Sequence, residues 1–359
     1  NVFRAASSKR PTVRNESRAM RINRLTRDCV RLKSTATAKM TMLARIIRLL
    51  ADGAVVAVLA AGLIGHLARD RIVAIAALTY LPLVPISAAA LLYDLIRRGR
   101  TTGSHQPYRL AGLSGLSLAW ALSGMWGWHT APAPAQPRPP VRAILQNVWW
   151  GGGWDRSPET WKETYDGLMA ENADVLFLAE APERPWFVPL ADKAGWSFAL
   201  AEHDPVEATW FRLVIMSRWP HRTMQTKRFP RGAGLVVHID RPKAPFVVMM
   251  VDGRSWPTRD RAQDLAAVWR FIAEHNTKTP IDIIAGDFNA PARSVGFDAF
   301  REQYWLLNET CGTWRGTWPR SLPLVDVDQV WIRKGWTAED CRFRSTPHTD
   351  HIGLSATFR

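Results

Sequence analysis

Two short polar motifs near the end of the chain carry residue types that can support hydrolysis. "GDFN" at 286–289 follows an apolar run, and "TDH" at 349–351 precedes another. Strand side chains alternate in direction, so the acid and the amide of "GDFN" share one face at the mouth of a strand. Together with an acid and a histidine from "TDH", they can bind a divalent metal and activate a water. Gly-Asp-x-Asn also forms ordinary turns, so neither motif is specific by itself.

Three more polar residues lie at the ends of apolar runs that predict strands. Asn147 ends the run that begins at Val141, Glu180 ends "DVLFLAE", and Asp328 opens "DQVWI". Mg²⁺ favours one or two carboxylates, an amide oxygen and retained waters. We therefore expect Glu180, Asn147 and Asp350 to hold Mg²⁺, with Mn²⁺ as the alternative ion.

The other polar residues of the two motifs suit the chemistry of an attacking water. Asp287, within hydrogen-bond reach of a metal-polarised water, can orient it or take its proton. Asn289 is a neutral donor that can hold the nucleophile or a phosphoryl oxygen. His351, if an acid keeps it cationic, can stabilise the charge that develops on phosphorus. Plain loop or turn roles for Asn147 and Glu180 stay open.

The elements that must position these residues follow from the pattern after residue 140. Residues 259–275 form an amphipathic helical pattern. Strands are predicted at 141–148, 173–179, 213–217, 234–239, 246–251, 281–285, 328–333 and 352–358. This mixture indicates an α/β domain with at least one buried sheet. Trp149, Trp150 and Trp154 lie around a glycine run beside Asn147, and they could line the substrate, contact a bilayer or pack in the core.

The first third of the chain has the pattern of a membrane region. Three apolar runs, at 49–67, 72–96 and 110–128, each approach the ~20 residues that cross a bilayer. Glycine and proline are tolerated in such helices, and tryptophans suit the headgroup boundary. The sequence therefore predicts a membrane region at 45–130 with three transmembrane helices.

The charge of the chain is concentrated in the same region. Of the net +15, residues 1–110 contribute 19 Lys and Arg against 5 Asp and Glu, whereas residues 111–359 contribute 28 against 27. A nearly neutral domain gives no support for binding a nucleic-acid backbone through net charge. The positive-inside rule places the N-terminus and the 97–109 loop in the cytoplasm, and therefore 141–359 outside it.

The regions that flank the predicted spans differ in composition. Residues 1–44 are basic with little apolar periodicity, which predicts a tail without folded structure, and Met40 or Met42 is a candidate start. Residues 131–140, "APAPAQPRPP", predict an extended linker. Cys311 and Cys341 can form a disulfide outside the cytoplasm, or they can be free thiols.

The set of motifs, taken in chain order, resembles the endonuclease/exonuclease/phosphatase superfamily, which has the deoxyribonuclease I-like fold. The resemblance covers 141–359 and includes "VIMSRWP" at 214–220. It implies a four-layer α/β sandwich with two central sheets, and a Mg²⁺-dependent attack of water on a phosphoester. By motif, the metal would lie at Asn147 and Glu180 with Asp350 close by, the nucleophile at Asp287 and Asn289, and Asp328 would support His351.

The chain departs from the family pattern at one position. Members often carry a histidine where this chain has Val251-Asp252, and His238, one strand earlier, is not expected to replace it. Asp252 could compensate, although an exposed turn acid is the commoner case. The following helix keeps the family pattern as Arg259, Arg261 and Gln263. Asp326 would exchange roles with Asp328 if the strand register differs by two residues.

These observations favour a membrane-anchored, metal-dependent phosphoesterase with its catalytic domain outside a bacterial cell. A membrane tether suggests a lipid-linked phosphate, a phospholipid or an envelope polymer as substrate. The first alternative is an extracytoplasmic nuclease, which requires a local basic groove. The second is a catalytically inactive domain that binds a ligand at the membrane. The sequence indicates no protein partner.

Overall fold

The computed structural model describes residues 13–99, 109–128, 138–202, 211–255 and 260–359. The chain divides between Val58 and Leu59 into two compact units. Helix α1 (Val13–Ala68) begins in the first unit and ends in the second. The second unit holds the remaining elements. Most of the predicted linker at 131–140 lies outside the described residues.

Helix α1 is 56 residues long and includes much of the region expected to be an unfolded tail. The helix is explained by local propensity, because no glycine or proline occurs between Pro11 and Gly53. Within α1, Lys39–Ala68 is long and apolar enough to cross a membrane. At 1.5 Å per residue this part spans roughly 45 Å, more than the hydrocarbon core of a bilayer.

The other two predicted spans differ from the expectation of three transmembrane helices. The second is a pair of helices, η1 (Val73–Tyr80) and α2 (Leu83–Gly99), bent by 71° at the break between them. Pro82 lies in this break, where its missing N–H cannot continue a helix. The third, α3 (Arg109–Met125), has 17 residues and reaches only about 25 Å. In the described part of the chain, one helix alone meets the length and composition of a span, or two if the bent pair counts as one.

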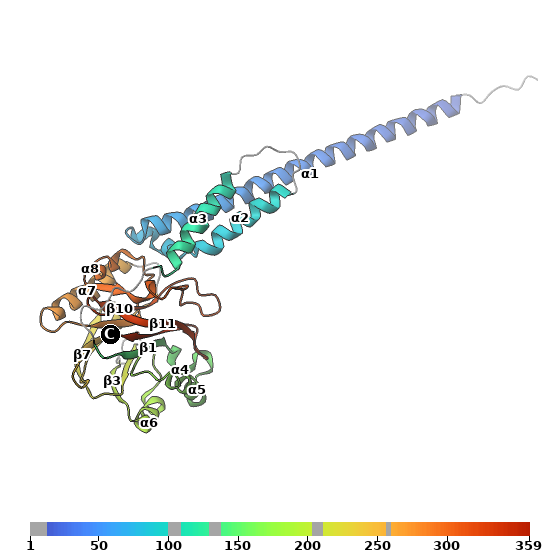
Figure 1. Ribbon diagram of the computed structural model, residues 1–359. Coiled ribbons are helices and arrows are strands. Elements are labelled where there is room, and N and C mark those ends of the chain that lie inside the picture. Colours follow the sequence, from blue (N-terminus) through green and yellow to red (C-terminus); the bar gives the residue numbers. More distant parts are fainter. Residues whose placement is uncertain (1–12, 100–108, 129–137, 203–210, 256–259) are drawn as a thin grey trace, which may run out of the picture. The chain divides into compact units, whose positions relative to one another are not determined.

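Two six-stranded mixed sheets form the centre of the C-terminal domain (Figure 1). The first sheet has the order β11 (Ala338–Ser345), β12 (Ile352–Phe358), β1 (Val141–Asn147), β2 (Val175–Ala179), β4 (Arg212–Ser217) and β3 (Ser197–Glu202). The second has the order β5 (His221–Phe229), β6 (Gly232–Ile239), β7 (Phe246–Gly253), β8 (Ile283–Asp287), β10 (Asp328–Arg333) and β9 (Tyr304–Leu306). Two parallel pairs, β1 with β2 and β7 with β8, align strand ends within each sheet.

The sheets and helices stack in four layers. Alternate residues of a strand face opposite sides, so Leu145 packs between the two sheets whereas Ile144 faces the helices outside the first sheet. Helices α5 (Pro158–Met169) and α6 (Arg184–Ala194) cover that outer face, and α7 (Arg261–Asn276) covers the second sheet. Short helices α4 (Trp149–Gly152) and α8 (Phe300–Gln303) and turns η2 (Gly153–Asp155), η3 (Val295–Phe297) and η4 (Leu307–Glu309) complete the domain. The predicted α/β sandwich with two central sheets flanked by helices is therefore confirmed.

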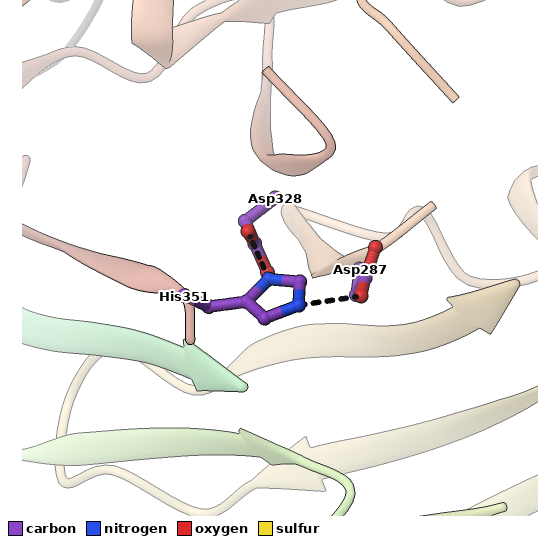
Figure 2. Close-up of side chains that lie close together, drawn as sticks. All are labelled: Asp287, Asp328 and His351. Atoms are coloured by element: carbon purple, nitrogen blue, oxygen red, sulfur yellow. Dashed lines mark hydrogen bonds and ion pairs between the residues drawn. The ribbon is translucent and has the colours of Figure 1, made fainter. Parts of the chain in front are cut away.

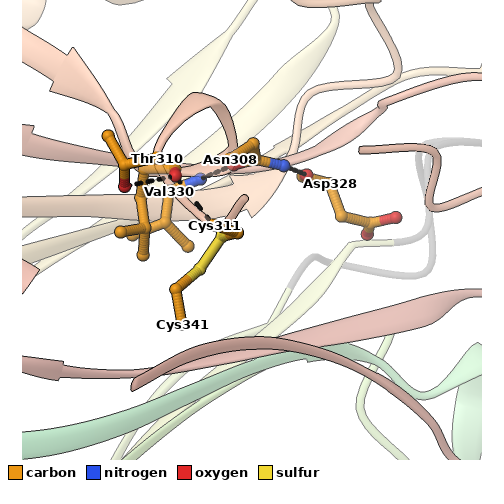
Figure 3. The surroundings of a disulfide bond; sticks show 7 residues. Asn308, Thr310, Cys311, Asp328, Val330 and Cys341 are labelled. Atoms are coloured by element: carbon orange, nitrogen blue, oxygen red, sulfur yellow. Dashed lines mark hydrogen bonds between the residues drawn. A yellow bond between two sulfur atoms is a disulfide. The ribbon is translucent and has the colours of Figure 1, made fainter. Parts of the chain in front are cut away.

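A disulfide joins the edges of the two sheets. Cys311, just after η4, is bonded to Cys341 on β11, with 4.9 Å between their Cα atoms. The side chain of Asn308 in η4 donates to the Asp328 carbonyl at 2.9 Å and accepts from the Val330 amide at 3.2 Å (Figure 3). The pairing left open by the sequence is therefore present, and it ties β11 to the segment that supports β10.

Candidate active site

Three buried side chains lie together at the end of the second sheet (Figure 2). Asp287 ends β8 and Asp328 opens β10, and the antiparallel register places them directly opposite each other. His351, one residue before β12, has Nδ1 at 2.7 Å from Asp328 Oδ2 and Nε2 at 3.9 Å from Asp287 Oδ2. The imidazole, which comes from the first sheet, therefore lies between the two carboxylates of the second sheet.

The two carboxylates set the charge of His351. Burial by itself would lower the pKa of the imidazole, but the charge and hydrogen bond of Asp328, with Asp287 and Asp350, raise it to about 10. His351 is therefore an imidazolium at neutral pH. The hydroxyl of Thr349 orients it further, since it donates to the Asn147 carbonyl at 2.8 Å and accepts from the His351 amide at 3.2 Å.

Asn147 and Glu180 enter the site from the first sheet. The parallel pairing of β1 and β2 sets Asn147 beside Ala179, so Glu180 follows at the same sheet edge. Asn147 Nδ2 donates to Glu180 Oε1 at 3.2 Å and to Asp287 Oδ2 at 3.0 Å. The backbone of Glu180 has a φ of 49°, which is uncommon outside glycine and typical of functional sites. The strand ends of both sheets therefore converge on one point.

The structure also places the other two predicted residues at this point. The backbone amide of Asn289 donates to Asp287 Oδ1 at 2.8 Å, and the side-chain Nδ2 of Asn289 donates to the Gly253 carbonyl at 2.6 Å. Asp350 is half-buried, accepts from Trp318 Nε1 at 3.0 Å, and lies 3.8 Å from His351 Nε2.

The structure decides between Asp326 and Asp328. Asp326 accepts from the Ala292 amide at 3.1 Å and lies 3.4 Å from Arg315, whereas Asp328 holds His351. Both side chains are buried, so burial alone would not have separated them.

Asp252 is a buried acid beside Asp287, in a position that the sequence did not favour. It is buried at the end of β7 and pairs in parallel register with Asp287, so the exposed turn acid expected there is not what the structure contains. Burial, followed by the charges of Glu180 and Asp287, raises the pKa of Asp252 well above its usual range. His238 pairs with Asp240 at 2.8 Å toward the opposite end of β6, as expected for a residue outside the site. In the sequence, a role for Asp252 was indicated only by its place at the position where family members often carry a histidine.

The density of acids around one histidine fits a divalent cation. Burial and then Asp328 raise the pKa of Asp287 to about 7, and burial also raises that of Glu180. Neighbouring carboxylates in a buried site are stable only when some of them are protonated or when a cation neutralises their charge. The carboxylates of Glu180 and Asp287 are oxygen ligands of the kind that Mg²⁺ prefers. Asn147 directs its Nδ2 at both carboxylates, so its Oδ1, which accepts from the backbone amide of Trp149 at 2.9 Å, would face a cation there only after the side-chain amide flips.

Asp287, Asp328 and His351 also have potential ligand atoms within 4.8 Å of one another. His351 Nδ1 is engaged by Asp328, however, and the high pKa of the imidazole opposes metal ligation, which requires the neutral form. The arrangement is therefore better suited to hold a cationic histidine than to hold a metal at these three residues.

A cavity of about 430 Å³ opens over these groups. It is lined by Tyr80, Trp149, Glu180, Ser255, Arg261, Asp287, Asn289, Trp318, Val325, Val327, Asp350 and His351. Of the three tryptophans near Asn147, only Trp149 is among these residues, while Trp154 is 89% exposed. Arg259 lies outside the described residues.

The comparisons with known proteins agree with this geometry. Residues 144–351, more than half of the chain, match the Endonuclease/Exonuclease/phosphatase family, and the chain belongs to it. Members of this family typically hydrolyse phosphoesters and generally use a divalent metal. None of the curated proteins compared with the chain matches it significantly.

Solved structures resemble the domain at low sequence identity. A mannosyl-6-phosphatase from Bacteroides thetaiotaomicron is 13% identical with a TM-score of 0.50, over 61% of this chain and 99% of that one. The human Nocturnin catalytic domain is 15% identical with a TM-score of 0.49, over 62% and 93%. D. rerio TDP2, solved with a single-strand DNA product, is 18% identical with a TM-score of 0.47, over 62% and 100%.

Proposed function

We propose that the protein is a membrane-anchored, Mg²⁺-dependent phosphoesterase whose catalytic domain lies outside the cytoplasm. The observation that carries the proposal is the convergence of two sheets on one cavity. One sheet supplies Glu180 and Asn147, and the other supplies Asp287 with the acid that holds His351. In such an arrangement the acidic oxygens can hold a metal that activates water, and the buried imidazolium can stabilise the negative charge of a phosphoryl group.

Each residue has a role that follows from its contacts. Glu180 would hold the metal, which, when bound, polarises water and neutralises phosphoryl charge. Asp287, which ends β8 with Oδ2 at 3.9 Å from His351 Nε2, would take the proton of the attacking water. His351, charged through Asp328, would stabilise the developing negative charge on the phosphoryl oxygens. Asn289 would orient the nucleophile or a phosphoryl oxygen.

Two observations support a location at the outer face of the membrane. Lys39–Ala68 is long and apolar enough to cross a bilayer, and the basic residues before it favour a cytoplasmic N-terminus. Cys311 and Cys341 form a disulfide, and disulfides form and persist mainly in oxidising compartments outside the cytoplasm. We propose a multi-pass topology and a lipid-linked phosphate, phospholipid or envelope polymer as substrate.

The test is a turnover assay on the full chain purified in detergent. We expect Mg²⁺-dependent release of phosphate or alcohol from a phosphomonoester, a phosphodiester or a lipid phosphate, abolished by EDTA. Asp287→Ala and His351→Ala should each reduce turnover by roughly 10²-fold or more. Glu163→Ala, an exposed acid on α5 that contacts His348, is the matched control and should keep wild-type activity.

Two results would contradict the proposal. Cleavage of DNA without turnover of lipid phosphate would favour the nuclease, and no turnover together with no metal binding would favour a binding domain. A reporter fused after Arg359 tests the topology separately, because a cytoplasmic signal would place the catalytic domain on the opposite side of the membrane.

A further inference from the structure

Tyr80 reaches the active-site cavity from outside the family domain. It is the last residue of η1 and precedes the matched region, which begins at residue 144. Its hydroxyl donates to the Asn289 carbonyl at 2.7 Å and accepts from Arg261 Nε at 3.1 Å. Tyr80 therefore contacts the "GDFN" loop and the first residue of α7 at the same time.

The segment that carries Tyr80 is fixed to the loop that follows "GDFN". Asp70 is buried, accepts from the Val295 amide at 2.8 Å, and is hydrogen-bonded to the Ser294 hydroxyl. Arg69 forms an ion pair with Asp298 at 2.7 Å and donates to the Ser294 carbonyl at 2.8 Å. At least four contacts from two adjacent residues therefore anchor this segment, and the position of Tyr80 does not depend on its own hydrogen bonds alone.

Arg261 is the residue through which Tyr80 can act on a ligand. Only 3% of its surface is exposed, and it lines the same cavity as Asp287 and His351. Its Nη2 has no hydrogen-bond partner within the described residues. A buried guanidinium nitrogen without a partner is unfavourable unless a ligand or water accepts from it, and phosphate oxygens match its geometry. Tyr80 holds the Nε edge of this guanidinium, which leaves the terminal nitrogen for an anion.

We propose that Tyr80 is a substrate-positioning residue that orients Arg261 toward a non-reacting oxygen of the substrate phosphate. The inference rests on the proposed phosphoesterase function, and it adds that residues 69–80 form part of the active site. The family domain alone therefore lacks one wall of its substrate cavity. Tyr80 takes no part in proton transfer, so its loss should weaken substrate binding more than it slows the chemical step.

The first experiment compares Tyr80→Phe with Tyr165→Phe in the full chain in detergent with Mg²⁺. Tyr165, like Tyr80, donates to a backbone carbonyl, that of Leu190, but it is buried and lies on α5 outside the cavity. With bis(p-nitrophenyl) phosphate as probe, Tyr80→Phe should raise KM roughly three- to tenfold, the effect of one hydrogen bond, and change kcat less than about twofold. Tyr165→Phe should change neither value. Equal KM values for the two variants, or a loss confined to kcat, would overturn the proposal.

A double-mutant cycle tests whether Tyr80 acts through Arg261. Arg261→Lys keeps the positive charge and removes the Nε donor that contacts Tyr80. If the two residues act as one unit, Tyr80→Phe should raise KM much less in the Arg261→Lys background than in the wild type. Equal effects in both backgrounds would contradict a positioning role.

Binding of inorganic phosphate separates this inference from the proposed function. Inorganic phosphate can be titrated into the Asp287→Asn variant, which should not turn over substrate, and into the double variant that also carries Tyr80→Phe. Weaker phosphate binding with Tyr80→Phe supports the inference even if the wild type hydrolyses none of the phosphoesters tested. Wild-type turnover together with unchanged phosphate binding would leave the phosphoesterase standing and reject the role of Tyr80.

Discussion

Asp252 and Asp287 occupy matching positions at the ends of the parallel strands β7 and β8. Both are almost completely buried, and burial raises the pKa of each carboxyl group. The charges of Glu180 and Asp287 raise the pKa of Asp252 further, well above its usual range. Two carboxyl groups that resist ionisation therefore lie side by side at this edge of the second sheet.

Replacing Asp252 by asparagine should stabilise the protein more at alkaline than at acidic pH. A folded-state pKa above the unfolded value means that Asp252 stabilises fully below about pH 4 and loses this contribution as pH rises through its folded pKa. The free energy of unfolding of Asp252→Asn relative to wild type should therefore rise between pH 4 and pH 8. Denaturation in EDTA, followed by tryptophan fluorescence, measures this difference.

Asp166→Asn is the control for Asp252→Asn, because Asp166 is an exposed acid paired with Lys162. Its difference from wild type should stay nearly constant over the same pH range. If Asp252→Asn behaves in the same way, Asp252 is ionised in the folded protein.

Loss of Asp328 should lower the pKa of His351 and the activity together. Asp328→Asn removes the nearest negative charge, so the imidazole pKa, about 10 in the wild type, should fall toward neutrality. We expect turnover at pH 8 to fall by roughly 10²-fold or more, because the imidazolium is no longer maintained. NMR titration of the His351 ring in EDTA measures the pKa. Asp326→Asn, which alters an acid that does not contact His351, should leave that pKa unchanged.

The same interaction sets an alkaline limit on stability. The His351 pKa is raised above its unfolded value, so its contribution is complete below about pH 6.5 and is lost as pH rises through about 10. Wild-type protein in EDTA should therefore unfold more readily above pH 9, and Asp328→Asn should show a weaker dependence on pH in this range. An identical slope for both proteins would argue against the charged pair.

Mg²⁺ should stabilise the wild type through Glu180. A ligand that binds only the folded state raises the unfolding temperature, and here it also relieves repulsion among buried carboxylates. Thermal unfolding with and without Mg²⁺ should show an increase for wild type and for Glu171→Gln, which lies away from the cavity and pairs with Arg142. Glu180→Gln should show little increase and should need roughly tenfold or more Mg²⁺ for half-maximal turnover. An unchanged Mg²⁺ requirement would place the metal elsewhere.

Removal of the disulfide should destabilise the domain and weaken the support of Asp328. Cys311→Ala with Cys341→Ala should cost about 2–4 kcal/mol, the usual contribution of a native disulfide. Denaturation measured with and without dithiothreitol provides the control, because the reductant should destabilise the wild type and leave the double variant unchanged. If the reductant has no effect on either protein, the two thiols are not bonded.

The sequence by itself determined the fold class and most of the residues at the site. Strand-end polar residues such as Asn147 and Glu180 were recognisable because period-two apolar runs locate strands, and parallel pairing then aligns their ends. The apolar pattern indicated at least one buried sheet, and the family resemblance carried by the ordered motifs implied the two-sheet sandwich that the structure contains. These features depend on local patterns, which a linear sequence displays directly.

The tertiary structure showed that Asp328, the acid favoured by the motif, and not Asp326 holds His351, and it revealed the burial of Asp252. Asp326 and Asp328 have the same alternation in sequence, and only the register of β10 against β8 brings Asp328 opposite Asp287. The structure also showed that η1 and α2 are bent against each other and that α3 is short, so the second and third predicted spans are not simple transmembrane helices.

Tyr80 shows the limit of the sequence most clearly. Nothing local marks it, since it lies in an apolar run more than 200 residues before Asn289 in the chain. Its contact with the site depends on Arg69 and Asp70 pairing with residues of a distant loop. Contacts between distant segments are set by the packing of the whole unit, so they become visible only when the folded chain brings these residues together.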